Sequence, residues 1–144
     1  MNQLTDFLSA LRNFFDRHRM VESYNELSAI EQLEDLGSEY RRAVSFPLTF
    51  EIESDMIAIT YGIVIQDKVR GGDMLSYAKS NEQNIFILSQ LQDYMTSIDE
   101  DVEITQGEFF GQFQPDNPEN LPTVAVQVRT MYHKPVYSDF DLEA

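Results

Sequence analysis

The residues best suited to chemistry in this chain are carboxylates, and four of them stand close together. Asp99, Glu100, Asp101 and Glu103 fall within five consecutive positions, and such a group of oxygen ligands could hold a hard cation such as calcium. The regular Asp-x-Asp-x-Asp-Gly spacing of a dedicated calcium loop is absent, which favours the alternative of a solvated acidic turn. Like charges this close repel one another, so water or counterions must surround them.

Other candidate groups are sparse. The two histidines, His18 and His133, lie far apart in the sequence and have no metal-ligand spacing around them. The glycine-rich run Arg70-Gly71-Gly72-Asp73 follows a predicted strand without opening a helix directly, which disfavours a phosphate-binding loop. No nucleophile elbow or dinucleotide fingerprint occurs, and the absence of cysteine removes thiol catalysis and thiolate metal sites. The sequence therefore predicts no enzyme, no metal site and no cofactor.

Charge is the clearest compositional feature. The chain has 25 Asp and Glu against 10 Lys and Arg, a net charge of −15. Residues 1–70 hold 12 acids and 7 bases (net −5), whereas residues 71–144 hold 13 and 3 (net −10). Because binding to nucleic acid phosphates requires Lys and Arg, this is either an ordinary acidic surface that favours solubility or one that meets DNA without holding it. The single basic cluster is interpreted as a salt-bridging surface; it contains Arg12, Arg17, His18 and Arg19.

A strand followed by a helix must position many of these groups. Apolar residues alternate from Ile57 to Ile65, which is typical of a strand with one buried face. After a polar break over residues 70–79, the period changes to that of a helix. Ser80 and Gln83 form a capping box that predicts the start of this helix, and its buried stripe is predicted to be Ile85, Leu88, Leu91, Met95 and Ile98.

The remaining elements lie on both sides of this pair. A helix is predicted over residues 3–19, with an apolar stripe that consists of Leu4, Phe7, Leu8, Leu11, Phe14 and Phe15. Residues 20–45 are predicted to form a loop that contains a short helix. The alternating stretch 46–53 should form an antiparallel hairpin with the next strand through a turn at Ser54-Asp55.

Beyond the acidic turn, the pattern from Val102 indicates a strand with a bulge or bend at Gly107 and Gly111. A proline-rich loop over residues 115–122 leads into a last strand over residues 123–133. The resulting order α, β, β, α, β, β predicts an α+β fold in which a four-stranded, mainly antiparallel sheet carries two helices on one face.

We expect a single domain over residues 1–134 and a C-terminal acidic arm over residues 135–144. The arm carries large apolar side chains that could dock on a neighbouring subunit; these candidate inter-subunit residues are Val136, Tyr137, Phe140 and Leu142.

Several of these features together resemble a known family. They are the amphipathic first helix, the Phe46-Pro47 strand, the strand that leads to Asp67, the Ser80-Asn81-Glu82 start of a long helix, and the last strand after a Pro/Asp/Asn loop. The chain resembles the small head-to-tail connector proteins of tailed phages, which are related in fold to tail terminator and tail-completion proteins and include ring proteins of crAss-like phages. The resemblance covers roughly residues 1–134 and is most specific from Asp67 to Ile98, although residues 68–79 look inserted.

The resemblance implies a tail-terminator-like fold and a structural virion protein, assembled in the host cytoplasm. It implies a homomeric ring at the head–tail junction that contacts portal, connector or tail proteins and lets DNA pass, with no membrane partner. An electronegative lumen would suit that passage, which makes Asp99, Glu100, Asp101 and Glu103 candidate lumen or rim acids. The candidate inter-subunit loop is Arg70, Gly71, Gly72 and Asp73. The alternative, from another class, is an acidic intracellular adaptor or inhibitor that binds a basic protein surface.

Overall fold

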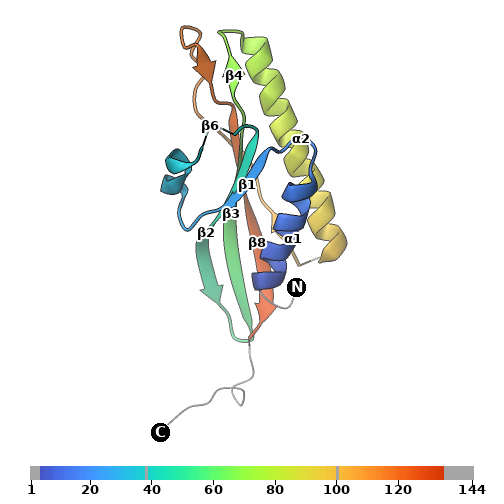
Figure 1. Ribbon diagram of the computed structural model, residues 1–144. Coiled ribbons are helices and arrows are strands. Elements are labelled where there is room, and N and C mark those ends of the chain that lie inside the picture. Colours follow the sequence, from blue (N-terminus) through green and yellow to red (C-terminus); the bar gives the residue numbers. More distant parts are fainter. Residues whose placement is uncertain (1–3, 38, 100, 135–144) are drawn as a thin grey trace.

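The computed structural model describes residues 4–37, 39–99 and 101–134. It shows an α+β fold with two main helices, a mixed six-stranded sheet and a small two-stranded sheet (Figure 1). The large sheet has the order β1-β2-β3-β8-β5, and β6 also pairs with β8. In chain order the elements are α1 (Leu4–Arg17), β1 (Ser23–Glu26), the 3₁₀ helix η1 (Ile30–Asp35), β2 (Arg42–Ile52), β3 (Met56–Gln66), β4 (Val69–Arg70), α2 (Met74–Ile98), β5 (Glu103–Ile104), β6 (Glu108–Phe110), β7 (Glu119–Asn120) and β8 (Thr123–His133).

Three long antiparallel strands form the centre of the large sheet. β3 pairs with β2 through the turn at Ser54-Asp55 and with β8 along its whole length. The predicted hairpin is thus confirmed, and β8 matches the predicted last strand at both ends. Val, Ile, Thr and Tyr dominate β3 and β8, and these residues suit a pleated, largely buried surface.

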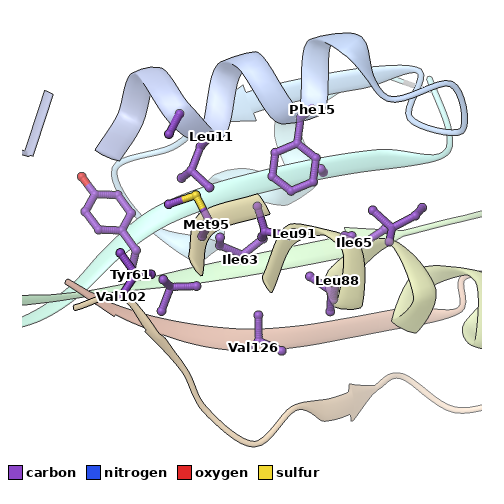
Figure 2. Close-up of a cluster of buried hydrophobic side chains, with 14 of the residues drawn as sticks. Leu11, Phe15, Tyr61, Ile63, Ile65, Leu88, Leu91, Met95, Val102 and Val126 are labelled. Atoms are coloured by element: carbon purple, nitrogen blue, oxygen red, sulfur yellow. The ribbon is translucent and has the colours of Figure 1, made fainter. Parts of the chain in front are cut away.

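Both helices cover the same face of this sheet, as predicted. Phe7, Leu11 and Phe15 of α1 are buried in one cluster with Ile63 of β3 and Leu91 of α2. Figure 2 shows Leu11, Phe15, Ile63 and Leu91 between the helices and the strands. The apolar stripe of the first helix was therefore correctly predicted, and the main core lies on this covered face.

The capping-box prediction at Ser80 is wrong. α2 begins at Met74, and Asp73 is its N-cap: the Asp73 carboxylate accepts a hydrogen bond from the backbone N–H of Leu75 at 3.0 Å. Ser80 lies buried inside the helix and donates to the Asp67 carboxylate at 2.6 Å. The stretch 74–79, read from the sequence as a polar break, thus forms the first turns of α2.

The buried stripe of α2 agrees only in part with the prediction. Leu88, Leu91 and Met95 are buried, but Ile85 and Ile98 are 45% and 49% exposed. The apolar residue that reaches the core near the middle of the helix is Ile87. The buried side of α2 was mispredicted for two reasons: the helix begins about two turns earlier than expected, and its buried side includes the polar residues Ser80, Asn81 and Asn84. A pattern based on apolar residues alone cannot identify such a side.

The sheet has more strands than the predicted four. The four-residue strand β1, in the stretch expected to be a loop with a short helix, pairs in parallel with residues 42–45 of β2. Tyr24 anchors it, because its ring stacks on Phe15 at a centroid distance of 4.9 Å and its hydroxyl hydrogen-bonds to Ser45 at 2.8 Å. The predicted strand after α2 is divided into β5 and β6 on either side of Gly107, which agrees with the expected bend.

The opposite face of the sheet has a much smaller buried cluster. Val44, Phe46 and Val64 are buried there, with Leu33 and Leu36 packed over them. In Figure 1, η1 lies on this side of the sheet and the two long helices lie on the other.

Candidate interaction surface

An apolar groove of about 510 Å³ lies on the face of the sheet that α1 and α2 leave uncovered. η1 bounds it on one side and the segment 106–111, which contains β6, bounds it on the other. Its floor comes from β2, β3 and β8. The apolar lining includes Leu33, Phe46, Leu48, Val64, Phe110 and Leu121.

Two local features of the sequence shape the floor of the groove. Phe46 lies opposite Gly62 across the β2–β3 ladder, and a Cβ atom at Gly62 would lie 2.5 Å from Cζ of Phe46. Only glycine lets the aromatic ring lie this close to the strand. The register between β2 and β3 shifts between Pro47 and Thr49, so Leu48 is the extra residue of a bulge and lines the groove.

A row of hydrogen-bonded polar side chains crosses the three strands at one end of this floor. Arg42 donates from Nε and Nη2 to Oε1 of Gln66 at 3.0 and 2.7 Å, and Gln66 donates to Thr123 at 2.9 Å. Arg42 also donates to the backbone carbonyl of Gly37 at 2.9 Å. Because these buried groups are paired with one another, the row closes the apolar floor without leaving a reactive group in it.

Carboxylates stand at the edges of the groove. Glu108 lines it directly, and η1 exposes Glu31, Glu34 and Asp35 beside the lining residues Ile30 and Leu33. Side chains three residues apart align along a 3₁₀ helix, so the two apolar residues form one row and Glu31 and Glu34 form the next. None of the four carboxylates forms an ion pair within the described residues. We call the groove with Glu31, Glu34, Asp35 and Glu108 at its edges the acidic groove.

The predicted acidic turn lies elsewhere, after α2. Asp99 is the C-cap residue of α2, and its carboxylate accepts a hydrogen bond from the backbone N–H of Asp101 at 2.9 Å. Asp101 and Glu103 are exposed, and Glu100 lies outside the described residues. Among the described residues, no three His, Asp or Glu side chains come together where they could hold a metal.

The predicted inter-subunit loop is tied into the fold. Arg70 belongs to β4, which pairs with β7, and Asp73 caps α2. Gly71 has a φ of +87°, a conformation that favours glycine. A Cβ atom at Gly72 would lie 2.2 Å from the backbone oxygen of Pro115, so this glycine permits close packing on the proline-rich loop. The other predicted interaction residues, Val136, Tyr137, Phe140 and Leu142, lie outside the described residues.

No pattern in the sequence predicted the ionic network that links the residue before β2 and the residue after β3 to α2. Arg41 donates to Asn84 at 2.7 Å, to Gln83 at 2.8 Å and to the Asp67 carboxylate at 3.0 Å. Ser80 donates to the same carboxylate. Every partner stabilises the charge of Arg41, so the network joins the start of β2 to α2 and has a structural role. Asp67 and Ser80, which carry part of the family resemblance, thus meet in space.

The basic cluster predicted at the end of α1 has a mixed outcome. Arg12 forms an ion pair with Glu26, as expected for a salt-bridging surface, whereas Arg17 and Arg19 are exposed and form no ion pair within the described residues. His18, between them, hydrogen-bonds through Nε2 to Gln90 of α2 at 2.6 Å.

Tyr24, which packs against α1, has a perturbed pKa and a structural role. Burial raises the pKa of the Tyr24 hydroxyl, and its hydrogen bond with Ser45 only partly opposes that rise. Tyr24 therefore stays protonated through the neutral range.

Comparison with known proteins adds no assignment. No protein-family model matches the chain, and no curated protein matches its sequence. Within the described residues, neither helix is both long and apolar enough to cross a membrane. The acidic groove, as an exposed apolar surface with unpaired charges around it, is the feature of this fold that most needs a partner.

Proposed function

We propose that this protein is a non-enzymatic structural protein of a tailed phage, which assembles with copies of itself into a ring at the head–tail junction. The ring joins portal and tail proteins and lines the channel through which DNA passes. The observation that carries the proposal is the acidic groove, because a large apolar surface left open on a folded domain is typical of a protein–protein interface. The resemblance to connector and tail terminator proteins supplies the assembly and the place in the virion.

The charge of the chain supports a role around DNA without adhesion to it. At a net charge of −15, most surfaces of the protein repel phosphates. A channel wall of this kind lets a duplex move without the counterion release that makes protein–DNA complexes stable. In this proposal, Asp99, Asp101 and Glu103 face the lumen or the rim of the ring.

Mass photometry and negative-stain imaging over a range of protein concentrations test the assembly. Rings or stacked tubes of a single subunit number are the expected result. Their absence at millimolar concentration, and with portal and tail proteins added, would contradict the proposal.

The acidic groove also favours a second candidate from a different class. An acidic adaptor or inhibitor would bind an apolar segment flanked by Lys and Arg on another protein, since such a segment complements the groove in both polarity and charge. A strict 1:1 complex with a basic partner, in place of rings, is the result that distinguishes this function.

A further inference from the structure

We propose that the acidic groove binds the helix side of a second copy of this chain, through the exposed ring of Phe86 and the cations Arg17 and Arg19. This inference rests on the proposed ring and deepens it. A closed ring of identical subunits requires two unlike, complementary surfaces on each subunit, and the inference names both.

The second surface is a stretch of α2 together with the end of α1. Gln90 follows Phe86 by one helical turn and Lys79 precedes it by two, so the three share one face of α2. The hydrogen bond between His18 and Gln90 holds the end of α1 against this face. Phe86 is 57% exposed. We call this surface the basic ridge; it consists of Arg17, His18, Arg19, Lys79, Phe86 and Gln90.

The charges of the two surfaces are complementary. Arg17, Arg19 and Lys79 form no ion pair within the described residues, and neither do the carboxylates of the acidic groove. Two acids, Glu82 and Asp93, lie on the same side of α2 as the ridge. The surface therefore carries three positive and two negative side chains. On a chain with 25 acids and 10 bases, this local excess of positive charge is the complement that the groove requires.

The positions of the two surfaces suit a head-to-tail contact. α1 and α2 lie on one side of the sheet, while η1, which bounds the groove, lies on the other (Figure 1). When the ridge of one copy fills the groove of the next, each end of the pair still offers one free surface. Such a heterologous contact propagates from copy to copy, and it forms a closed ring when the rotation between successive subunits divides a full turn.

Apolar and ionic contacts have separate roles in this interface. The ring of Phe86 would leave water for a groove lined by Phe46, Val64 and Phe110, and this burial supplies most of the affinity. The arginines would meet Glu31 and Glu34 at the edge of the groove, and these pairs select the orientation and suppress other packings.

Charge reversal on each surface tests the contact. We would compare Arg17→Glu/Arg19→Glu on the ridge with Glu31→Arg/Glu34→Arg on the groove. Each variant alone should raise the dissociation constant of self-association at least about tenfold, measured by sedimentation velocity and mass photometry. An equal mixture of the two variants should restore assembly, because each reversed surface then meets a reversed partner.

Two matched controls separate the contact from general effects. Asp55→Arg/Asp116→Arg changes the charge by the same amount at two exposed sites, the tip of the β2–β3 hairpin and the proline-rich loop, and should leave assembly unchanged. Phe86→Ser should weaken assembly, whereas Phe50→Ser, at a site 68% exposed on β2, should not. Circular dichroism and thermal unfolding of each variant verify that it is folded.

A gain of affinity provides an independent test that loss of folding cannot imitate. Glu82→Lys/Asp93→Lys removes the two acids from the ridge and should strengthen self-association several-fold at low salt. The gain should diminish as salt screens the added charges.

The outcomes distinguish the contact from the ring itself. Wild-type rings that persist unchanged in both reversal variants would overturn the contact and leave the ring standing. Loss of assembly in each variant without recovery in the mixture would also overturn it. A wild-type protein that stays monomeric at millimolar concentration, and with portal and tail proteins added, would overturn both proposals. Binding of a synthetic apolar peptide flanked by lysines to that monomer would identify the groove as an adaptor site.

Discussion

The two faces of the central sheet come from the same three strands but are completed in different ways. On the covered face, Ile63, Ile65 and Val126 pack beneath α1 and α2 in a large apolar cluster. On the open face, Val44, Phe46 and Val64 form a cluster of three under η1, and the rest of the apolar surface remains as the acidic groove. Most of the buried apolar core therefore lies on the covered face, while the open face keeps the exposed apolar surface that the proposed assembly would use.

The largest effect on stability is expected at Arg41, the buried cation that links the strand β2 to the covering helix α2. Arg41→Ala would remove a buried cation and leave the partly buried Asp67 carboxylate and the buried Asn84 without their donor. It should lower the free energy of unfolding by about 3–5 kcal/mol, measured by urea denaturation. Lys68→Ala, which removes a more exposed ion pair with Glu119, should cost no more than about 1 kcal/mol. Equal losses would show that the Arg41 network has no special role.

A direct comparison of the faces uses two leucines. Leu91→Ala empties a fully buried site on the covered face and should cost about 2–5 kcal/mol. Leu48, in the groove, is 44% exposed, so Leu48→Ala should cost less than about 1 kcal/mol while it weakens assembly. Comparable destabilisation by both changes would mean that the open face belongs to the folding core.

The start of the covering helix α2 gives a smaller effect. Asp73→Ala removes the N-cap and should cost about 1 kcal/mol, again measured by urea denaturation. Asp73→Asn is the matched control, since asparagine caps helices about as well as aspartate. If the alanine variant were as stable as the wild type, the helix would begin later, close to Ser80.

The smallest effect on stability is expected at the acidic turn outside both faces. Replacing Asp99, Glu100, Asp101 and Glu103 with lysine should change the free energy of unfolding by no more than about 1 kcal/mol, because exposed charges contribute little. In assembled particles the same variant should slow DNA ejection at low salt, and high salt should relieve the defect.

Normal ejection by this variant at low salt would place these acids away from the lumen. Their interpretation as a solubilising turn would then stand.

Much of the fold was predictable because its strongest elements have simple periods. The alternation in β8 and the apolar stripe of α1 agree with most of their buried residues. The alternation in β3 predicted only one buried face, whereas residues 61–66 are buried on both faces because the sheet is covered on both sides there. β1 was not predictable in this way, since the sequence SYNE has no apolar pattern. It becomes a strand because Tyr24 packs on Phe15 and bonds to Ser45, two residues that the folded chain brings to it.

The candidate interaction surface likewise has features that the sequence determines and features that depend on tertiary packing. The sequence by itself determined the excess of acid, the single basic cluster and the absence of cysteine, because these are properties of composition. Only the tertiary structure decided that Phe46 and Val64 would meet under one open groove. It also decided that the edge carboxylates would lie on the face of the sheet opposite the two long helices. Those residues come from separate elements, and the pairing register of β2, β3 and β8 is what places their side chains on one face. A sequence pattern describes one element at a time, so a surface shared by several elements exists only once they have packed.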